Sequence, residues 1–443
     1  MKKSKLLLGA VLGLGLASAT AQEVSVDALI RPRFEYRHGF QDVVPESTDG
    51  AAFVSQRSSL LLKYTDEKIT TFLDFQSVNV WGDRAQLQRD DNNENGGLRI
   101  NQAWADVKLG NGFSAKVGRQ IINLDDQRIF GGVGWTQQQR THDAAVLKYK
   151  TGGFKAQLGF GFNQNGPGNF DSEFTASGAG VGLFQYKGLQ YLHLNNKFSD
   201  SFSGSFLFTS NQFQDVVVEG VSDGSGNSSR QTTGIHGKYK QGKFGLDFSG
   251  YYQFGEIQNG TSGVTSDISA WNAAVNATYK VGTTVLGLGA EALSGNDSDT
   301  VQQDAFFPLF GTNHKFNGYQ DFFFVGRHAN NGGLLDINAK AIFKLAPKSK
   351  LITAAHLFSG LEDAPTNGVL VDSGYYGTAV DLVFVQKINK YSNIKVGYSQ
   401  TFFDSDFADA RANGDADDIQ NWGWVQLTIK PNLFKWKKPA ETK

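Results

Sequence analysis

The sequence predicts an all-β protein: a transmembrane antiparallel β-barrel of about 18 strands, with long extracellular loops and short periplasmic turns. Three observations predict this fold. The chain begins with a stretch typical of an export signal, it then repeats segments in which apolar and polar residues alternate, and the connections between these segments alternate between long and short. A closed barrel satisfies every backbone hydrogen bond within a membrane, so strands of this kind can cross it.

Residues 1–21 form the expected export signal. Lys2, Lys3 and Lys5 precede an apolar stretch from Leu6 to Leu16, and Ala19-Thr20-Ala21 supplies the small residues that a signal peptidase needs. The whole chain has 42 basic and 43 acidic residues, so loss of three lysines leaves a small acidic excess. A general nucleic-acid binder would instead carry a strong positive excess.

The composition restricts the fold class further. Aromatic residues reach 13% with 35 Phe, Gly is frequent at 52, and hydrophobic residues make up only 40%. After the signal, no apolar run approaches the ~18–20 residues of a membrane-spanning helix. The chain has no Cys, which excludes disulfides and cysteine metal sites. Two classes remain: a large soluble β protein and a transmembrane β-barrel.

The first expected strand, 24–37, shows the alternation most clearly. Its apolar face consists of Val24, Val26, Ala28, Ile30, Phe34 and Tyr36. Its other face carries charged residues, among them Arg31, Arg33 and Glu35. Successive side chains of a strand point to opposite faces, so one face suits lipid and the other needs water.

The same alternation recurs along the chain, for example at 154–163, 268–280 and 335–345. In 268–280, aromatic residues bracket small apolar ones, as expected where rings lie at both membrane interfaces. In chain order the expected strands are 24–37, 53–64, 68–80, 100–109, 113–122, 142–150, 154–163, 188–198, 202–213, 231–241, 243–254, 268–280, 284–294, 332–346, 350–360, 375–387, 391–403 and 421–430.

The connections discriminate between the two classes. The even-numbered ones are short turns such as Thr65-Asp66-Glu67 and Gly110-Asn111-Gly112, whereas the odd-numbered ones are long and polar. In a membrane barrel all long loops then lie on one side and all turns on the other, a constraint that a soluble sandwich lacks. The barrel is expected to occupy 22–430. Pairing is expected to stop at Pro431, which has no N–H to donate, leaving 431–443 as a basic tail.

One stretch, from Asp74 to Tyr149, contains a series of distinctive sequence blocks. In chain order they are Asp74-Phe75-Gln76-Ser77-Val78-Asn79-Val80-Trp81-Gly82-Asp83, Asn101-Gln102-Ala103-Trp104-Ala105-Asp106, Val117-Gly118-Arg119-Gln120, Asp126-Gln127-Arg128-Ile129-Phe130-Gly131, Trp135 and Arg140-Thr141-His142-Asp143-Ala144. In the order and spacing of these blocks the stretch resembles the alginate-export family of outer-membrane porins. It implies an 18-stranded barrel whose lumen is lined with arginines that conduct an anionic polysaccharide. The matching positions are Arg119, Arg128 and Arg140, with Asp74, Gln76, Trp135 and Asp143.

The alternation itself also points charged residues into the lumen. Arg31, Arg33 and Arg57 come from two adjacent strands, with Glu35 and Asp74 close by. Rings of basic residues in a pore favour anions, so these arginines are the expected filter. The alternative is that lumen charges only solvate the interior. The inward lysines near the turns are expected to form the periplasmic rim rather than the constriction.

The connection 123–141 is the expected constriction loop. It carries Arg128, Trp135 and Arg140, and folding inward would narrow the pore and place charges across it. The alternative is an exposed extracellular loop.

Two acidic loops, 90–95 and 404–418, have the oxygen-rich composition that can hold Ca²⁺, but no EF-hand spacing is present, so a solvated acidic surface is the preferred interpretation. No cofactor is expected. The seven histidines are scattered without an HExxH motif, so we expect no enzyme.

The leading functional hypothesis is an outer-membrane porin for passive passage of small anionic or hydroxylated solutes such as sugar acids and oligosaccharides. One alternative is an exporter of an anionic polysaccharide such as alginate, as the family resemblance implies. Another is a structural or adhesion barrel with a plugged lumen. The expected partners are outer-membrane lipid, the barrel assembly machinery and a small-molecule or polysaccharide solute, but no nucleic acid. The sequence leaves the direction of transport and the oligomeric state open.

Overall fold

The computed structural model describes residues 23–438 apart from 84–96, 168, 170–173, 175–184, 260–261, 297–302, 324–331 and 367–368. The expected signal at 1–21, the acidic stretch 90–95 and the end of the basic tail at 439–443 lie outside the described residues.

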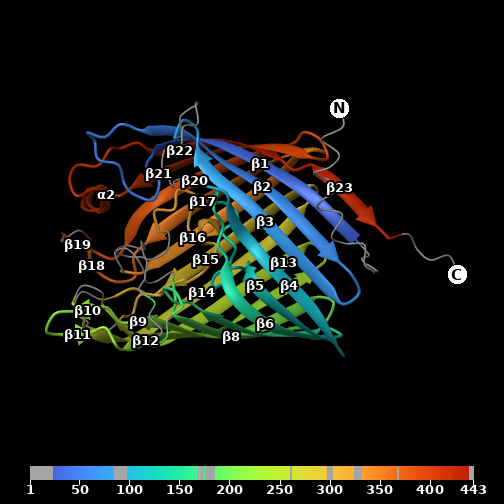
Figure 1. Ribbon diagram of the computed structural model, residues 1–443. Coiled ribbons are helices and arrows are strands. Elements are labelled where there is room, and N and C mark those ends of the chain that lie inside the picture. Colours follow the sequence, from blue (N-terminus) through green and yellow to red (C-terminus); the bar gives the residue numbers. More distant parts are fainter. Residues whose placement is uncertain are drawn as a thin grey trace.

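A single antiparallel sheet closes into a barrel (Figure 1). Consecutive long strands pair with each other, and β22 returns to pair with β1, for example Phe34 with Val425. The sheet contains 19 strands, but β22 and β23 are successive segments of one strand position, so the barrel has 18 positions. The prediction of an antiparallel 18-stranded barrel is confirmed.

The barrel strands are β1 Glu23–His38, β2 Ala51–Thr65, β3 Ile69–Val80, β4 Arg99–Gly110, β5 Phe113–Gln120, β6 His142–Thr151, β7 Phe154–Phe162, β8 Gly188–Lys197, β9 Phe202–Gln214, β12 Asn227–Gln241, β13 Phe244–Gln258, β14 Thr265–Val281, β15 Thr284–Leu293, β16 Leu334–Ala346, β17 Ser349–Ser359, β20 Tyr375–Lys387, β21 Ser392–Phe403, β22 Gln420–Ile429 and β23 Asn432–Lys437. The long loops hold the remaining elements: β10 Val217–Val218, β11 Ser222–Asp223, the 3₁₀ turn η3 Asn313–Lys315, β18 Ala364–Thr366, β19 Val369–Val371 and α2 Ser405–Ala412.

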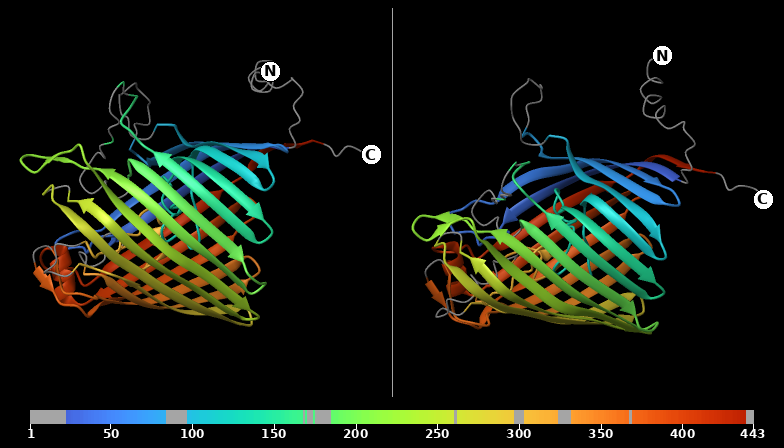
Figure 2. Two further views of the ribbon diagram at one scale, coloured as in Figure 1. Left: turned by 90° about the horizontal axis from the view of Figure 1, so that it is seen from below. Right: turned by 60° about the horizontal axis from the view of Figure 1, so that its bottom comes forward.

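Long and short connections alternate as the sequence predicts. Figure 2 shows all short turns at one end of the barrel and the loops at the other. The strands β12, β13 and β14 extend several residues further toward the loop end than expected, because their polar and glycine residues continue the pairing there. Among the residues that the structure describes, no helix is long and apolar enough to cross a membrane.

The end of the chain differs from the prediction. Pairing with β21 does end at Ile429, two residues before Pro431. Pairing with β1 resumes beyond the proline, however, and β23 joins Val24 to Trp436 and Val26 to Phe434. The missing N–H of Pro431 interrupts the ladder locally, and its carbonyl still accepts a bond from the Ala28 N–H at 3.1 Å. Residues Asn432–Lys437 of the expected basic tail therefore form the last part of the final strand.

The outer surface of the barrel is an apolar belt. Its members alternate in sequence with residues that face the lumen, and all are large and exposed: Ile30, Phe34, Leu60, Val117, Leu147, Phe160, Ile235, Val275, Leu288, Ile337, Leu382, Val396 and Val425. Exposure of so much apolar surface on every side is what a lipid-facing barrel requires.

Strand β14 presents neighbouring residues to lipid and to the lumen, so the two faces can be compared by substitution. Val275 is 45% exposed on the outer face between Trp271 and Tyr279, whereas Asn276 faces inward. Arginine on the lipid face near the bilayer midplane costs roughly 2–4 kcal/mol. We therefore expect Val275→Arg to reduce the fraction that refolds into lipid vesicles, and Asn276→Arg to leave it near the parental value. The difference in gel mobility between boiled and unboiled samples measures that fraction, and equal behaviour would show that the faces of β14 are wrongly assigned.

The hydrophobic core of the molecule lies inside the barrel, at the loop end. Side chains of two long loops, 121–141 and 294–333, pack against inward residues of the wall. Phe130, Phe306 and Phe310 have no exposed surface, and the wall contributes Leu189 and Tyr191. A barrel of this size would otherwise leave an aqueous channel, so these loops decide how much of the lumen stays open.

Candidate functional site

Arg31 holds the loop 121–141 against the barrel wall. From β1 its guanidinium donates to the carbonyl of Gly134 at 2.8 Å and to that of Thr136 at 2.7 Å, while its Nε donates to the Gln137 side chain at 3.1 Å. A loop inside a barrel leaves backbone carbonyls unpaired, and arginine has five donors in a fixed fork that can satisfy several of them. The expectation that this loop folds into the lumen is confirmed.

Arg33 and Arg57 extend the same attachment. Arg33 donates to the Trp135 carbonyl at 2.8 Å, and Arg57, on β2, contacts the Gln137 carbonyl at 3.4 Å. The side chain of Gln137 in turn donates to Ser55. Gln137 is thus a functional residue that the sequence did not reveal, because only the folded loop shows which of three successive glutamines turns to the wall.

Glu35 balances the charge of this group. It has no exposed surface, and it accepts from Arg33 at 2.8 Å, from Arg37 at 2.9 Å and from the indole of Trp422 at 3.2 Å. The guanidinium of Arg33 also lies 4.0 Å from the ring centroid of Trp135. A buried charge must be paired and hydrogen-bonded in this way, so Arg33 and Glu35 form a structural network within the wall.

Asp74 and Gln76 continue the network onto β3 and β4. The Asn101 side chain donates to Asp74 at 2.8 Å and to Gln139 of the loop at 2.9 Å, and Arg99 donates to Gln76 at 3.0 Å. Asp74 and Gln76 are at most 1% exposed. Both face inward as expected, but the loop covers them, so they do not meet solute.

Arg128 ties the loop 121–141 to a third part of the molecule. Its guanidinium is 2% exposed and donates to Glu291 of β15 at 2.7 Å and to Asn317 at 2.9 Å. Asn317 belongs to the second inward loop and itself donates to Glu291 at 2.9 Å. The expected filter arginine is therefore a buried link between two loops and the wall.

Arg140 is the remaining loop arginine. It donates to the Gly311 carbonyl at 2.9 Å and so joins the two inward loops near Phe310. Burial lowers the pKa of Arg140 to about 10, which leaves it charged at neutral pH. Like Arg128, it stabilises the constriction from within.

The pair Arg119–Asp143 corrects the sequence-based prediction. Both residues share the face of Val117, which points to lipid, whereas their neighbours Gln120 and His142 point inward. They form a bidentate ion pair at the loop end of the barrel, and 48% of each side chain is exposed. They also line one side of a cavity of about 230 Å³ at the rim. They do not line the pore.

Several lysines among the described residues do present charge to the lumen. Lys340 and Lys350 face inward from β16 and β17 and are exposed, and Lys395 of β21 faces inward beside Arg31. Lys116 and Lys148 do the same on the opposite wall, where Lys148 pairs with Asp106. Of these five, Lys395 is one of the inward lysines near the turns that were expected to form the periplasmic rim rather than the channel wall.

A second attachment of the loop 121–141 lies at its tip. His193 contacts the Asp125 carboxylate at 2.9 Å, and the Ser205 hydroxyl donates to it at 2.6 Å. Burial acts to raise the pKa of Asp125, but the hydrogen bond and charge of His193, together with Ser205, outweigh burial and hold that pKa below its usual range. Asp125 therefore stays ionised and fixes the tip to β8 and β9.

The acidic loop 404–418 contains the short helix α2. Asp404 caps it by accepting from the N–H groups of Asp406 and Phe407, and Asp409 accepts from the Ala416 N–H at 2.9 Å. These carboxylates satisfy backbone donors and do not converge on a cation position. For 90–95 a solvated acidic surface stays the prediction and calcium binding the alternative, since those residues lie outside the described part of the chain.

Comparison with known proteins supports the fold. No protein-family model matches the chain, and no curated protein matches it in sequence, so the likeness to the alginate-export family stays a resemblance. Solved structures match nearly the whole chain. A BenF-like porin from Pseudomonas fluorescens Pf-5 shares 12% identity at a TM-score of 0.63, over 93% of this chain and 99% of that one.

Two further similar structures were solved with a carboxylate compound. Pseudomonas aeruginosa OccK2 (OpdF), in complex with glucuronate, shares 12% identity at a TM-score of 0.61, over 95% of this chain and all of that one. Pseudomonas aeruginosa OpdK, solved with vanillate, shares 11% identity at a TM-score of 0.60, over 93% of this chain and 99% of that one. Identities this low establish the fold alone. With its apolar outer belt and polar inner wall, the chain has the fold of these outer-membrane porins.

Proposed function

We propose that the protein is a passive channel for small anionic solutes, sugar acids among them, rather than an enzyme. The observation that carries the proposal is the set of inward lysines on the turn side of the constriction. Lys350 lies close enough to both Lys340 and Lys395 for mutual repulsion, and Asp381 attracts Lys340. Among the residues that the structure describes, none of these three lysines forms a direct ion pair with a carboxylate. Basic residues that line a pore favour anions. The glucuronate and vanillate described for two structural neighbours are both carboxylates, which supports this choice of solute.

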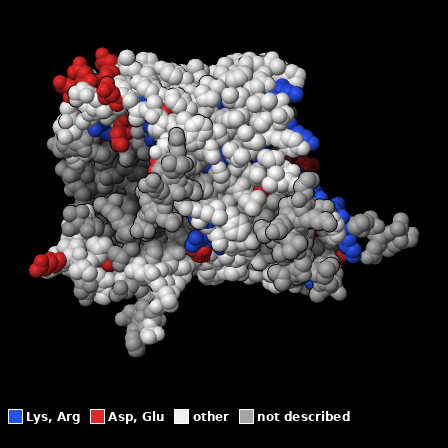
Figure 3. Space-filling model, turned by 45° about the horizontal axis from the view of Figure 1, so that its top comes forward, with Lys and Arg blue, Asp and Glu red and all other residues white. Residues whose placement is uncertain are grey.

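Charges at the two ends of the barrel have opposite effects on an approaching anion. Figure 3 shows aspartate and glutamate gathered at the loop end and lysine and arginine at the turn end. The acidic mouth would repel anions, but exposed charges are screened over about 8 Å at physiological ionic strength. Charges inside a narrow lumen with low-dielectric walls act more strongly on a passing ion. The lysines of the wall are therefore expected to determine the selectivity.

Substitution of the wall lysines tests the proposal. We expect the triple variant Lys340→Gln, Lys350→Gln and Lys395→Gln to reduce the preference for anions about fivefold, the factor that corresponds to roughly 1 kcal/mol of electrostatic attraction. The reversal potential in a salt gradient across a planar lipid bilayer measures this preference.

The control removes the same charge from the turns, with Lys243→Gln, Lys348→Gln and Lys390→Gln, all exposed outside the strands. This variant should keep most of the parental reversal potential. Cation preference in the parental protein, or equal shifts in both triple variants, would contradict the proposal. A parental protein without steady current would instead indicate a plugged barrel.

A further inference from the structure

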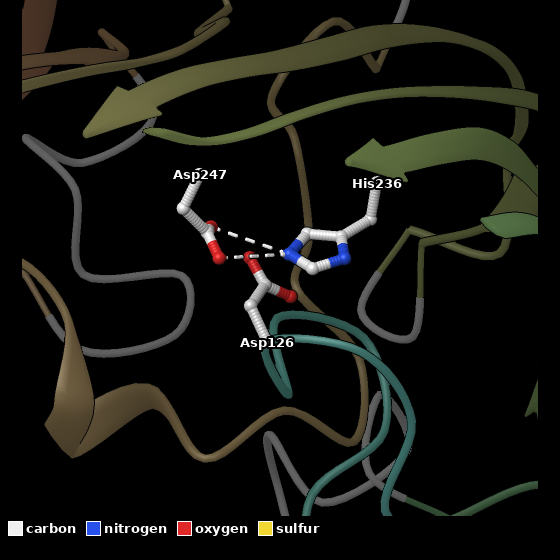
Figure 4. Close-up of side chains that lie close together, drawn as sticks. All are labelled: Asp126, His236 and Asp247. Atoms are coloured by element: carbon white, nitrogen blue, oxygen red, sulfur yellow. Dashed lines mark hydrogen bonds and ion pairs between the residues drawn. The ribbon is translucent and has the colours of Figure 1, made fainter. Parts of the chain in front are cut away.

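Three ligand-type side chains converge inside the barrel, where the constriction loop meets the wall. Asp126 comes from the tip of the loop 121–141, His236 from β12 and Asp247 from β13 (Figure 4). Their ligand atoms all lie within 4.8 Å of one another, and His236 Nε2 is 3.2 Å from the nearer oxygen of Asp247. Ligands held at 2.0–2.2 Å around a tetrahedral metal ion lie roughly 3.4 Å apart, so a small inward adjustment would complete such a site.

The second observation is the state of the Asp126 carboxylate. Asp126 is 8% exposed, and its Oδ1 accepts only the N–H of Arg128, at 3.0 Å. Its other oxygen accepts no hydrogen bond from the residues that the structure describes, and the carboxylate pairs with no lysine or arginine among them. A buried carboxylate is costly unless it is paired or bound to a metal. This one points toward His236 and Asp247.

The nearby cations do not supply the missing partner. Lys315 attracts the Asp126 carboxylate from nearby, but its Nζ donates to the backbone carbonyl of Asp126 at 2.7 Å and not to the carboxylate. The Nζ of Lys238 lies 3.6 Å from Asp247 Oδ2, and 54% of the Lys238 side chain is exposed, so this lysine pairs with Asp247 and not with Asp126. Both lysines weaken the attraction of the cluster for a cation without occupying it.

We propose that Asp126, His236 and Asp247 bind a divalent transition-metal ion of the zinc class, which fastens the constriction loop to the barrel wall. One imidazole nitrogen and two carboxylates are a donor set that suits such ions, whereas Ca²⁺ and Mg²⁺ prefer oxygen ligands alone. The proposal goes beyond solute passage and does not depend on the identity of the solute.

The surroundings fit a bound metal ion. Nε2 of His236 would be the ligand, and the opposite nitrogen, Nδ1, lies 3.9 Å from the Asp125 carboxylate, the kind of partner that orients a metal-bound histidine. The side chain of Asp247 is 35% exposed, which leaves a path for the ion and room for a water ligand. Since Asp126 belongs to the loop and the other two ligands to the wall, the ion would connect the two directly.

Calorimetric titration with ZnCl₂ tests the site. The full chain in detergent micelles is first dialysed against a chelator. We expect one Zn²⁺ to bind per chain, and Asp126→Asn and His236→Gln each to weaken its binding at least tenfold, because even substitutions of second-layer residues weaken metal sites by about 10–100-fold. Co²⁺ provides an independent readout, since its visible absorption reports a tetrahedral site with nitrogen and oxygen ligands.

The matched control is His356→Gln. His356 lies on β17 and contacts Asp336 at 2.9 Å, so it is another buried histidine–carboxylate pair, but it is not part of the cluster. This variant should bind Zn²⁺ like the parent. Failure of the parental protein to bind one equivalent, or equal losses in His356→Gln and His236→Gln, would overturn the proposal. The gel mobility of unboiled samples verifies that each variant is folded, and Asp247→Asn, at the more exposed ligand, provides a further variant if His236→Gln does not fold.

Discussion

Replacing Arg128 with methionine should weaken the docking of the constriction loop by about 3–5 kcal/mol. The substitution removes the guanidinium and leaves the carboxylate of Glu291, 7% exposed, without its cation. An uncompensated buried charge is more costly than the loss of the pair as such. The Gly131 amide, which donates to the Phe310 carbonyl at 2.8 Å, reports on docking. Its hydrogen exchange should be faster by roughly a hundredfold to a few thousandfold.

Two further variants distinguish the cost of leaving a buried charge unpaired from the contribution of the ion pair itself. The double variant Arg128→Met and Glu291→Gln should recover most of the loss, because no unpaired charge remains and the glutamine oxygen can still accept from Asn317. Arg119→Met removes a pair of similar geometry that is half exposed, and exposed pairs contribute about 0–1 kcal/mol. If Arg128→Met and Arg119→Met have equal effects on exchange at Gly131, the buried pair does not hold the loop.

The architecture could be predicted because it follows from local patterns. In 268–280 the polarity of each side chain indicates whether it faces lipid or the lumen. The ladder between β13 and β14 preserves that alternation over 15 residue pairs. Errors arose where the backbone departs from the pattern. Pro431 interrupts the ladder without ending the strand, and in 404–418 the cap formed by Asp404 begins a helix that acidic composition alone does not indicate.

For the candidate site, the sequence predicted which face of a strand a side chain occupies but not which residues it contacts. Alternation places Arg31 and Arg33 on the inner face, but it cannot show that a loop 100 residues later covers them, since Arg31 and Gly134 are 103 positions apart. The same holds for Arg128 and Glu291, 163 positions apart. Arg119 is a different case, because only the family resemblance placed it in the lumen, whereas in the structure it shares the outer face of Val117.

The inward lysines and the inward arginines are expected to have different roles. The lysines of the wall are expected to determine selectivity, whereas the arginines of β1 are expected to determine how far the pore is narrowed. Arg31 donates to the carbonyls of Gly134 and Thr136 and to the side chain of Gln137. Hydrogen bonds from a charged donor contribute about 1.5–3 kcal/mol each, so Arg31→Ala should weaken docking of the loop by roughly 3–6 kcal/mol.

Single-channel recording in planar bilayers should therefore show a larger and noisier conductance for Arg31→Ala, because the loop leaves the wall for part of the time. The reversal potential should change less than in the triple lysine variant, since Arg31 is 8% exposed and scarcely accessible to a passing ion. Arg37→Ala is the matched control: it lies on the same face of β1 and its side chain contacts Glu35, not the loop. It should leave the conductance nearly unchanged. If Arg31→Ala instead keeps the parental conductance and shifts the reversal potential as far as the lysine variant does, Arg31 acts as a filter for ions and not as an anchor for the loop.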